Sequence, residues 1–333
     1  MISPTLCARL QSAKNLLAFS AGVDSSALFF LLHERGIAFD IAFVNYHTRA
    51  ECESEEAHAK KLAQEFQKKC FVYHSPPIPH NFEHNARVVR FMFFESLVEQ
   101  HGYVHLLLAH QLNDRLEWLL FALTRGCGLD SLLGVSEEIR HTQNQTPYTL
   151  LRPLHAIPKS ALYTYLRARN LPFFEDSSNT DLRYTRNTLR PWLISLTDSF
   201  APQIARSFEI LESERVQLFA FEAMQVERLL LCKSERAQAA FVASKALKRL
   251  GYVPTGAQRK EMERQNLHCV LGGAFAVGFA HGFVFVAPFL RRAIPKPLKE
   301  QCRKLRIPPL VRPYIASCPH VLQRVQQILT FES

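Results

Sequence analysis

Residues 16–32 read LLAFSAGVDSSALFFLL and predict a strand, a tight turn and a helix in that order. Residues 16–19 are apolar, as is typical of a strand buried in a parallel sheet. The turn over 20–25 consists of small residues, and the apolar residues after Ser26 indicate a buried helix. Free backbone N–H groups and the helix dipole both point into such a turn, so it can bind an anion. We therefore expect phosphate binding here, with an ordinary small-residue turn as the alternative.

The turn lacks the Gly-Lys-Ser/Thr of a Walker loop, so it offers no lysine to the β and γ phosphates. It resembles instead the PP-loop signature Ser-Gly-Gly-X-Asp-Ser of ATP pyrophosphatases, which split ATP into AMP and pyrophosphate. Ala21 stands where that signature has its first glycine. Because alanine disfavours positive φ, we expect the φ of residue 21 to be negative or only mildly strained.

The bulk composition is that of a folded, basic protein. The 333 residues are enough for about two domains, and 47% are hydrophobic, which excludes wholesale disorder. The net charge of +10 is common among nucleic-acid-binding proteins, although solubility alone is an alternative reason for it. The eight cysteines form no Cys-X-X-Cys pair, so we expect reduced thiols rather than a zinc site or a disulfide framework.

One apolar segment, residues 272–290, is long enough to cross a membrane. It contains four glycines, His281 and Pro288, and it is rich in Phe and Val, so two strands joined by a turn at 280–282 fit it better. No N-terminal signal segment is evident. We expect a cytoplasmic protein without a membrane partner.

Strands and helices alternate four times in the first half of the chain. After the first unit, apolar strands are expected at 41–44, 71–74 and 104–109, each followed by a helix. This alternation predicts an α/β fold, with a Rossmann-like, doubly wound parallel sheet. Asn45 and His47 follow the second strand, at the edge where such sheets bind ligands. The polar residues 136–148 have no clear period and are expected to form a surface loop.

The second half is expected to contain a long connecting helix, a small module and a basic tail. An amphipathic pattern predicts the helix over 203–235, and an α+β module follows to about residue 290. The tail has nine basic residues and two acidic ones, and its six prolines predict an extended chain that contacts a polyanion. The domains are therefore expected at 1–200 (ATP-binding and catalytic), 201–235 (linker helix), 236–290 (small α+β) and 291–333 (tail).

Residues 175–190, EDSSNTDLRYTRNTLR, are dense in polar side chains. Arg186 and Arg190 are four residues apart, so a helix would project both from one face. They could clamp a phosphate, or the segment could be no more than a solvated helix face.

Taken together, these motifs resemble the tRNA(Ile)-lysidine synthetase family in order and spacing over about residues 14–195, and more weakly over 237–290. They are the PP-loop, Val44-Asn45 with His47, the stretch from Asn81 to Arg87, Leu108-Ala109-His110 with Asp114 and Glu117, Arg125-Gly126 with Gly128-Leu129, Arg152-Pro153-Leu154, and Glu175-Asp176 leading to Arg186 and Arg190.

The resemblance implies an enzyme that modifies the wobble cytidine of the isoleucine tRNA with the anticodon CAU. ATP adenylates the base at the C2 carbonyl oxygen, and the ε-amine of free L-lysine then attacks C2 and expels AMP. The resemblance assigns Asp24 and Asp114 to Mg²⁺, and it makes His110 or a carboxylate the group that takes the amine proton. It assigns ATP binding to Ser20, Ala21, Gly22, Val23, Asp24, Ser25 and Asn45, and catalysis to Asp24, His110, Asp114, Arg186 and Arg190.

The chain departs from the family at one motif. The family has His-His-X-Asp-Asp-Gln, whereas residues 110–115 read HQLNDR. We expect Asn113 to remove a possible metal charge and Arg115 to add a cation near the metal.

Two other functions stay open from the sequence. One is another PP-loop enzyme, such as a tRNA thiolase or a GMP synthetase, although a thiolase of this group needs paired cysteines. The other is a non-catalytic RNA-binding protein on a decayed PP-loop domain. The sequence is compatible with a homodimer but does not fix the oligomeric state.

Overall fold

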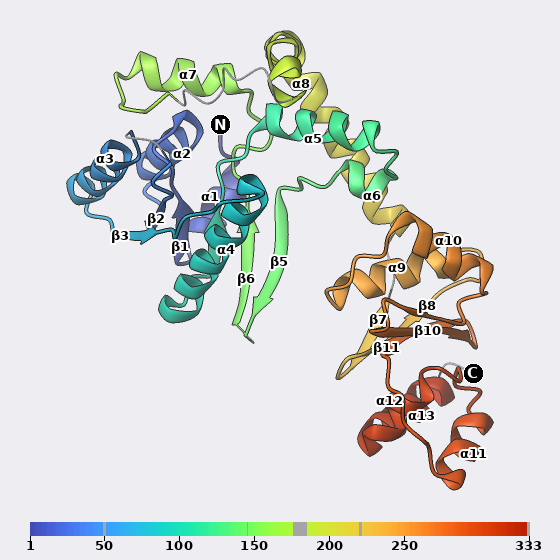
Figure 1. Ribbon diagram of the computed structural model, residues 1–333. Coiled ribbons are helices and arrows are strands. Elements are labelled where there is room, and N and C mark those ends of the chain that lie inside the picture. The colour runs from blue at the N-terminus through green and yellow to red at the C-terminus, as the bar shows by residue number, and fades with distance from the viewer. Residues whose placement is uncertain (49–50, 145, 176–184, 220–221, 332–333) are drawn as a thin grey trace. The chain divides into compact units, whose positions relative to one another are not determined.

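The computed structural model describes residues 1–48, 51–144, 146–175, 185–219 and 222–331. The chain divides into two compact units, Met1–Leu218 and Phe219–Ser333 (Figure 1).

The first unit is built on a six-stranded sheet in the order β3-β2-β1-β4-β6-β5. Every neighbouring pair is parallel except the edge pair β5–β6. The parallel, doubly wound sheet predicted from the sequence is thus confirmed. The strands are β1 (Asn15–Ala18), β2 (Phe39–Asn45), β3 (Cys70–His74), β4 (His105–Leu107), β5 (Glu138–Gln143) and β6 (Thr146–Leu151).

Helices cover both faces of this sheet because successive strand residues point to opposite sides. Leu17 and Ile41 pack into one buried cluster with α1, α2, α3 and α7, whereas Leu16 and Ala42 pack into another with α4. Burial on both faces explains the continuous apolar runs of the strands. The helices of this unit are α1 (Pro4–Gln11), α2 (Val23–Glu34), α3 (Glu51–Glu65), α4 (Phe82–His101), α5 (Leu112–Thr124), α6 (Leu129–Leu132), α7 (Lys159–Ala168) and α8 (Thr185–Phe219).

Residues 136–148 form most of a hairpin, so the predicted surface loop is wrong. β5 is an edge strand and pairs only with β6. An edge strand needs few apolar residues, and here burial falls on Tyr148, Leu150 and Leu151 of β6. The apolar alternation was therefore too sparse to indicate two strands.

The predicted helix over 203–235 is wrong beyond Phe219. α8 contains a non-helical residue at Phe200, and the chain then enters two short strands, β7 (Ala223–Val226) and β8 (Leu229–Lys233). The apolar run 229–232 is short, and its periodicity alone does not separate a strand from a continuing helix.

The second unit is a five-stranded antiparallel sheet covered by helices on both faces. Its strand order is β7-β8-β11-β10-β9. Leu230 and Val284 pack with α9 and α10, whereas Leu231 and Phe285 pack with α11, α12 and α13. Its remaining elements are β9 (Cys269–Leu271), β10 (Phe275–Ala280), β11 (Phe283–Pro288), α9 (Ala239–Arg249), α10 (Gly256–Arg264), α11 (Lys296–Lys304), α12 (Arg312–Ser317) and α13 (Pro319–Phe331).

The strand–turn–strand predicted for 272–290 is confirmed by β10 and β11. His281 and Gly282 join the two strands with φ of 51° and 72°, as a two-residue hairpin turn requires. Among the described residues, no helix is both long and apolar enough to cross a membrane.

Residues 291–331 are largely helical, so the predicted extended tail is wrong. Prolines occupy the first or second position of both α11 and α12, where a missing N–H costs no hydrogen bond. These prolines therefore start helices instead of extending the chain. The connection between α11 and α12 lies so close to the sheet that a Cβ at Gly278 would collide with Pro308.

Candidate active site

The turn between β1 and α2 is held in shape by its own serines. The Ser25 hydroxyl accepts a hydrogen bond from the backbone N–H of Ser20 at 3.2 Å and donates one to the Gly22 carbonyl at 3.1 Å. The Ser26 hydroxyl donates to the Ala21 carbonyl at 3.2 Å. Gly22 is the N-cap of α2, and within the described residues no side chain caps this helix. The first N–H groups of α2 are therefore available to an anion.

Ala21 has a φ of 61°, so the prediction of a negative or mildly strained φ is wrong. Its side chain is fully buried, and its carbonyl accepts a hydrogen bond from the Phe174 N–H at 2.9 Å. Gly22 forms a parallel bridge with Phe174. Tertiary contacts thus hold alanine in a conformation that costs an L-residue about 1–2 kcal/mol. The bridge also brings the start of the polar segment 175–190 beside the PP-loop.

Asn45, at the end of β2, orders its own loop. The side-chain oxygen of Asn45 accepts a hydrogen bond from the His47 N–H at 2.9 Å, and its nitrogen donates to Glu56 at 2.8 Å. The residue is 1% exposed. Because both ends of this amide are engaged, its contribution to a nucleotide site would be to position the loop.

Asp114 lies in the first turn of α5, close enough to Asp24 for their charges to interact. One oxygen of Asp114 accepts a hydrogen bond from the Gln111 N–H at 2.9 Å, which caps α5. Burial, and then repulsion from Asp24, raise the pKa of Asp114 to about 7. The structure thus brings together the two carboxylates that the sequence assigned to a metal. Over the described residues, no cluster of three or more metal-ligating side chains exists, so other oxygens must complete any site.

The side chains of Asn113 and Arg115, on either side of Asp114, point away from the two carboxylates, so Arg115 does not supply the expected cation near the metal. Asn113 donates a hydrogen bond to the Thr197 hydroxyl at 2.7 Å and accepts one from the Lys159 N–H at 3.0 Å, so it joins α5 to α7 and α8. Arg115 is 2% exposed and donates to Glu212 of α8 at 2.9 Å. Adjacent helix residues point about 100° apart, and this is why these side chains miss the metal carboxylates.

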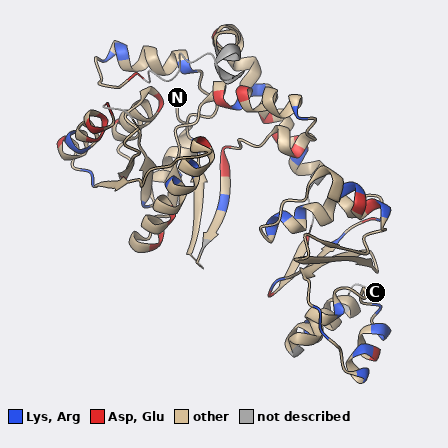
Figure 2. Ribbon diagram, in the orientation of Figure 1, with Lys and Arg blue, Asp and Glu red and all other residues tan. Residues whose placement is uncertain are grey.

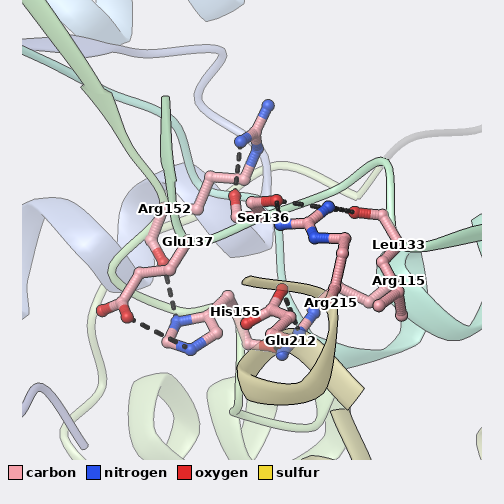
Figure 3. Close-up of polar contacts among 8 residues, drawn as sticks. All are labelled: Arg115, Leu133, Ser136, Glu137, Arg152, His155, Glu212 and Arg215. Atoms are coloured by element: carbon pink, nitrogen blue, oxygen red, sulfur yellow. Dashed lines mark hydrogen bonds and ion pairs between the residues drawn. The ribbon is translucent and has the colours of Figure 1, made fainter. Parts of the chain in front are cut away.

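Arg115 belongs to a polar network that fastens α8 to the other elements of the first unit (Figure 3). Its guanidinium lies 4.1 Å from the centre of the Phe208 ring. Arg215 donates hydrogen bonds to the Leu133 carbonyl and to the Ser136 hydroxyl, both at 3.1 Å. The Ser136 carbonyl accepts a hydrogen bond from Arg152, which directly follows β6. Ser136 therefore links α8 to the carboxyl end of that strand.

His110, which follows β4, is neutral and acts as an acceptor. Its Nδ1 accepts a hydrogen bond from Nε of Arg152 at 3.3 Å, because a guanidinium can only donate. Burial and the charges of Arg152, Arg87 and Arg90 lower the pKa of His110 to about 3. Such a weak base does not suit the proton-accepting role that the resemblance gave to His110.

Arg186 and Arg190 lie in the first turns of α8. Their side chains, together with residues 176–184, lie outside the described part of the structure. The residue that sequence reasoning did not place in the site is Arg152. Its position directly after a parallel strand was the available signal, because Ser20, His110 and Arg152 follow strands, and Asn45 ends a strand, whose carboxyl ends share one edge.

A family described as a PP-loop domain matches residues 4–197. The tRNA(Ile)-lysidine synthase of Wolinella succinogenes is 47% identical over 92% of this chain and 94% of its own length. The chain belongs to the tRNA(Ile)-lysidine synthase family. The enzymes of that name from Campylobacter jejuni and Helicobacter pylori are each 39% identical, over 94% and 92% of this chain and 96% and 90% of their own lengths.

Members of the tRNA(Ile)-lysidine synthase family are carbon–nitrogen ligases, and the PP-loop domain uses ATP. Among solved structures, the U34-tRNA thiolase NcsA from Methanococcus maripaludis is 17% identical, with a TM-score of 0.48 over 61% of this chain and 72% of its own. That likeness is too distant to bear on function.

Proposed function

We propose that this chain ligates free L-lysine to C2 of the wobble cytidine of the CAU-anticodon tRNA(Ile), through an adenylated tRNA. The supporting observation is membership of the tRNA(Ile)-lysidine synthase family over nearly the whole length, together with an uncapped α2 N-terminus at the PP-loop. The reaction releases pyrophosphate in the first step and AMP in the second. A thiolase or a decayed binding protein has no comparable support.

The PP-loop holds the phosphates of ATP in this proposal. The backbone groups of residues 20–25 surround the N-terminus of α2, where the helix dipole favours negative charge. Charge develops on the leaving pyrophosphate, so these donors stabilise the transition state of adenylation. Arg186 and Arg190 are proposed to contact phosphate as well, and Asn45 to order the adjoining loop.

Asp24 and Asp114 are the residues that would hold Mg²⁺. Two neighbouring carboxylates repel each other, and this contributes to the raised pKa of Asp114, so a divalent cation between them would remove that repulsion. Mg²⁺ commonly takes one or two carboxylates and completes its shell with phosphate oxygens and water. When bound there, it would supply charge neutralisation of the triphosphate.

The exposed basic residues before, along and just after α11 are the proposed surface for the tRNA. Figure 2 shows Lys and Arg gathered on this helix. Arg291, Arg292, Lys296, Lys299, Arg303, Lys304 and Arg306 are all exposed. The apolar side of α11, with Leu298 and Cys302, packs on the sheet. Phosphate contacts of this kind bind a nucleic acid without reading its sequence.

The test is mass analysis of the anticodon loop after the full chain has been incubated with ATP, lysine and tRNA(Ile). We expect one cytidine of the loop to gain the mass of lysine less water. An unmodified loop, or a modification that needs no lysine, would reject the proposed function.

A further inference from the structure

Arg152 is a buried cation that forms no ion pair with any carboxylate of the described residues, although the charge of Asp114 acts on it from a greater distance. The residue is 4% exposed, and its Nε and Nη1 donate hydrogen bonds to His110 Nδ1 at 3.3 Å and to the Ser136 carbonyl at 2.6 Å. In Figure 3 its guanidinium extends away from the Glu137 carboxylate. Within the described parts of the chain, Nη2 has no hydrogen-bond partner and no carboxylate pairs with the group. Burial of an unpaired charge is costly, so the arrangement is incomplete without an anion.

His110 adds a second donor at the same place. Because Nδ1 accepts from Arg152, the proton of the neutral imidazole must sit on Nε2. The Nε2–H group likewise has no partner among the described residues. His110 and Arg152 follow β4 and β6, which are neighbouring parallel strands, so both donors lie at the ligand-binding edge of the sheet.

Arg87 and Arg90 of α4 bring further positive charge. They lie three residues apart on one helix, and the charges of both lower the pKa of His110. The Arg87 guanidinium lies 4.8 Å from the centre of the Phe91 ring, and neither arginine is ion-paired to a described carboxylate. The cluster therefore carries three positive charges and at least two unused donors.

We propose that Arg152, His110, Arg87 and Arg90 form an oxyanion-binding site for a substrate group, either the α-carboxylate of lysine or a phosphate of ATP or tRNA. The inference rests on the proposed function. A guanidinium matches carboxylate and phosphate oxygens with parallel N–H groups, and an N–H imidazole adds a neutral donor. Since the PP-loop on β1 already receives the leaving pyrophosphate, the neighbouring site is suited to the second substrate. Anchoring lysine by its carboxylate would leave the ε-amine free to attack.

The two half-reactions allow the source of the oxyanion to be identified. Adenylation of tRNA is measured with ATP and no lysine, and the second step is measured by supplying amine to pre-adenylated tRNA. The amines are lysine, lysinamide and 1,5-diaminopentane, of which only lysine has a carboxylate. The proteins are the full wild-type chain, Arg152→Lys, and Arg169→Gln as a control for an exposed arginine that pairs with Glu34.

If the carboxylate of lysine is the ligand, both analogues should react with the wild type at a KM about 10- to 100-fold above that of lysine, the range of a missing charge-assisted hydrogen bond. Arg152→Lys should then raise the KM for lysine but not that for the analogues. If a phosphate is the ligand, Arg152→Lys should raise the KM for ATP or tRNA in the first step.

Unchanged KM values in both half-reactions of Arg152→Lys would overturn the site, as would a loss confined to thermal stability. The wild-type series with the three amines does not depend on whether the variant folds. If lysine, lysinamide and the diamine react equally well and adenylation by the variant is normal, the site is wrong. Failure of the proposed function looks different, because the wild type would then form no lysidine at all.

Discussion

Substituting Asn113→Asp should weaken the junction of α5, α7 and α8 in a pH-dependent manner. The Asn113 amide donates to Thr197 at 2.7 Å and accepts from the Lys159 N–H at 3.0 Å. The single hydroxyl proton of Thr197 is shared between the backbone carbonyls of Leu193 and Ile194, at 2.9 and 3.0 Å. An ionised carboxylate keeps the bond from Lys159 but has no proton for Thr197.

The expected cost at pH 7.5 is about 2 kcal/mol of unfolding free energy, from the absence of one buried hydrogen bond and the burial of a charge. That cost corresponds to raising the pKa of the new carboxyl from about 3.9 unfolded to about 5.4 folded, at about 1.4 kcal/mol per pH unit. The folded state then binds more protons than the unfolded state between these values. Stability should therefore be close to wild type below pH about 4 and fall as the pH rises through the folded pKa.

Tryptophan fluorescence during urea unfolding measures this effect directly. Both tryptophans of the chain, Trp118 and Trp192, lie in α5 and α8, so the signal reports the first unit alone. Asn113→Ala is the matched control, because it removes both hydrogen bonds and introduces no titrating group. Equal losses for Asn113→Asp at pH 4 and pH 7.5, or none at either, would refute the assignment of this donor.

Three further outcomes are expected. Asp114→Asn should abolish tRNA adenylation because a metal-binding carboxylate is lost. The variant should lose little stability, because an amide oxygen can still accept the hydrogen bond that caps α5. AMP formation at a near wild-type rate would exclude Asp114 as a metal ligand. Ala21→Gly should change the unfolding free energy by less than about 1 kcal/mol, because relief of the left-handed φ and loss of a buried methyl group offset each other. Ala21→Val should cost more than about 2 kcal/mol of unfolding free energy. Equal stability of the two variants would contradict the strained φ. Reversing Lys296, Lys299 and Arg303 to Glu should weaken tRNA binding and reduce the salt slope by about 0.9 for each phosphate that is no longer neutralised, measured by filter binding; an unchanged slope would remove α11 from the interface.

Charge reversal on α11 tests the basic segment more cleanly than deletion of 291–333 would. The helices of this segment bury Phe285 and Ala276 of the sheet, so deletion would expose the core of the second unit. Charge reversal on the exposed side of α11 leaves that packing intact. A loss of binding in the reversed variant can therefore be attributed to charge.

The first unit was predictable from sequence where the signal was local. Strand, turn and helix at residues 16–32 follow from an apolar run and small residues, and the placement of Asp24 and Asp114 follows from strand ends that share an edge. The sequence did not reveal features that depend on tertiary contacts. Ala21 adopts a positive φ because the Phe174 bridge and buried packing hold it there.

The other wrong predictions also concern features that depend on tertiary structure. The prolines of 291–333 were expected to keep the chain extended, but several of them occupy helix starts, which composition does not distinguish. Arg115 was expected to add a cation near the metal, but helix geometry and its partner Glu212 on α8 direct it elsewhere. The place of Arg152 beside His110 depends on the pairing of β4 with β6, which are distant in the sequence.

The most direct test of the central claim uses ATP labelled at the α-phosphate, mixed with the full chain and tRNA(Ile) in the absence of lysine. The account predicts that the label becomes attached to the tRNA and is released as AMP when lysine is added. Label that never reaches the tRNA, or that stays on it after lysine is added, would contradict the claim that this PP-loop activates a nucleobase for ligation.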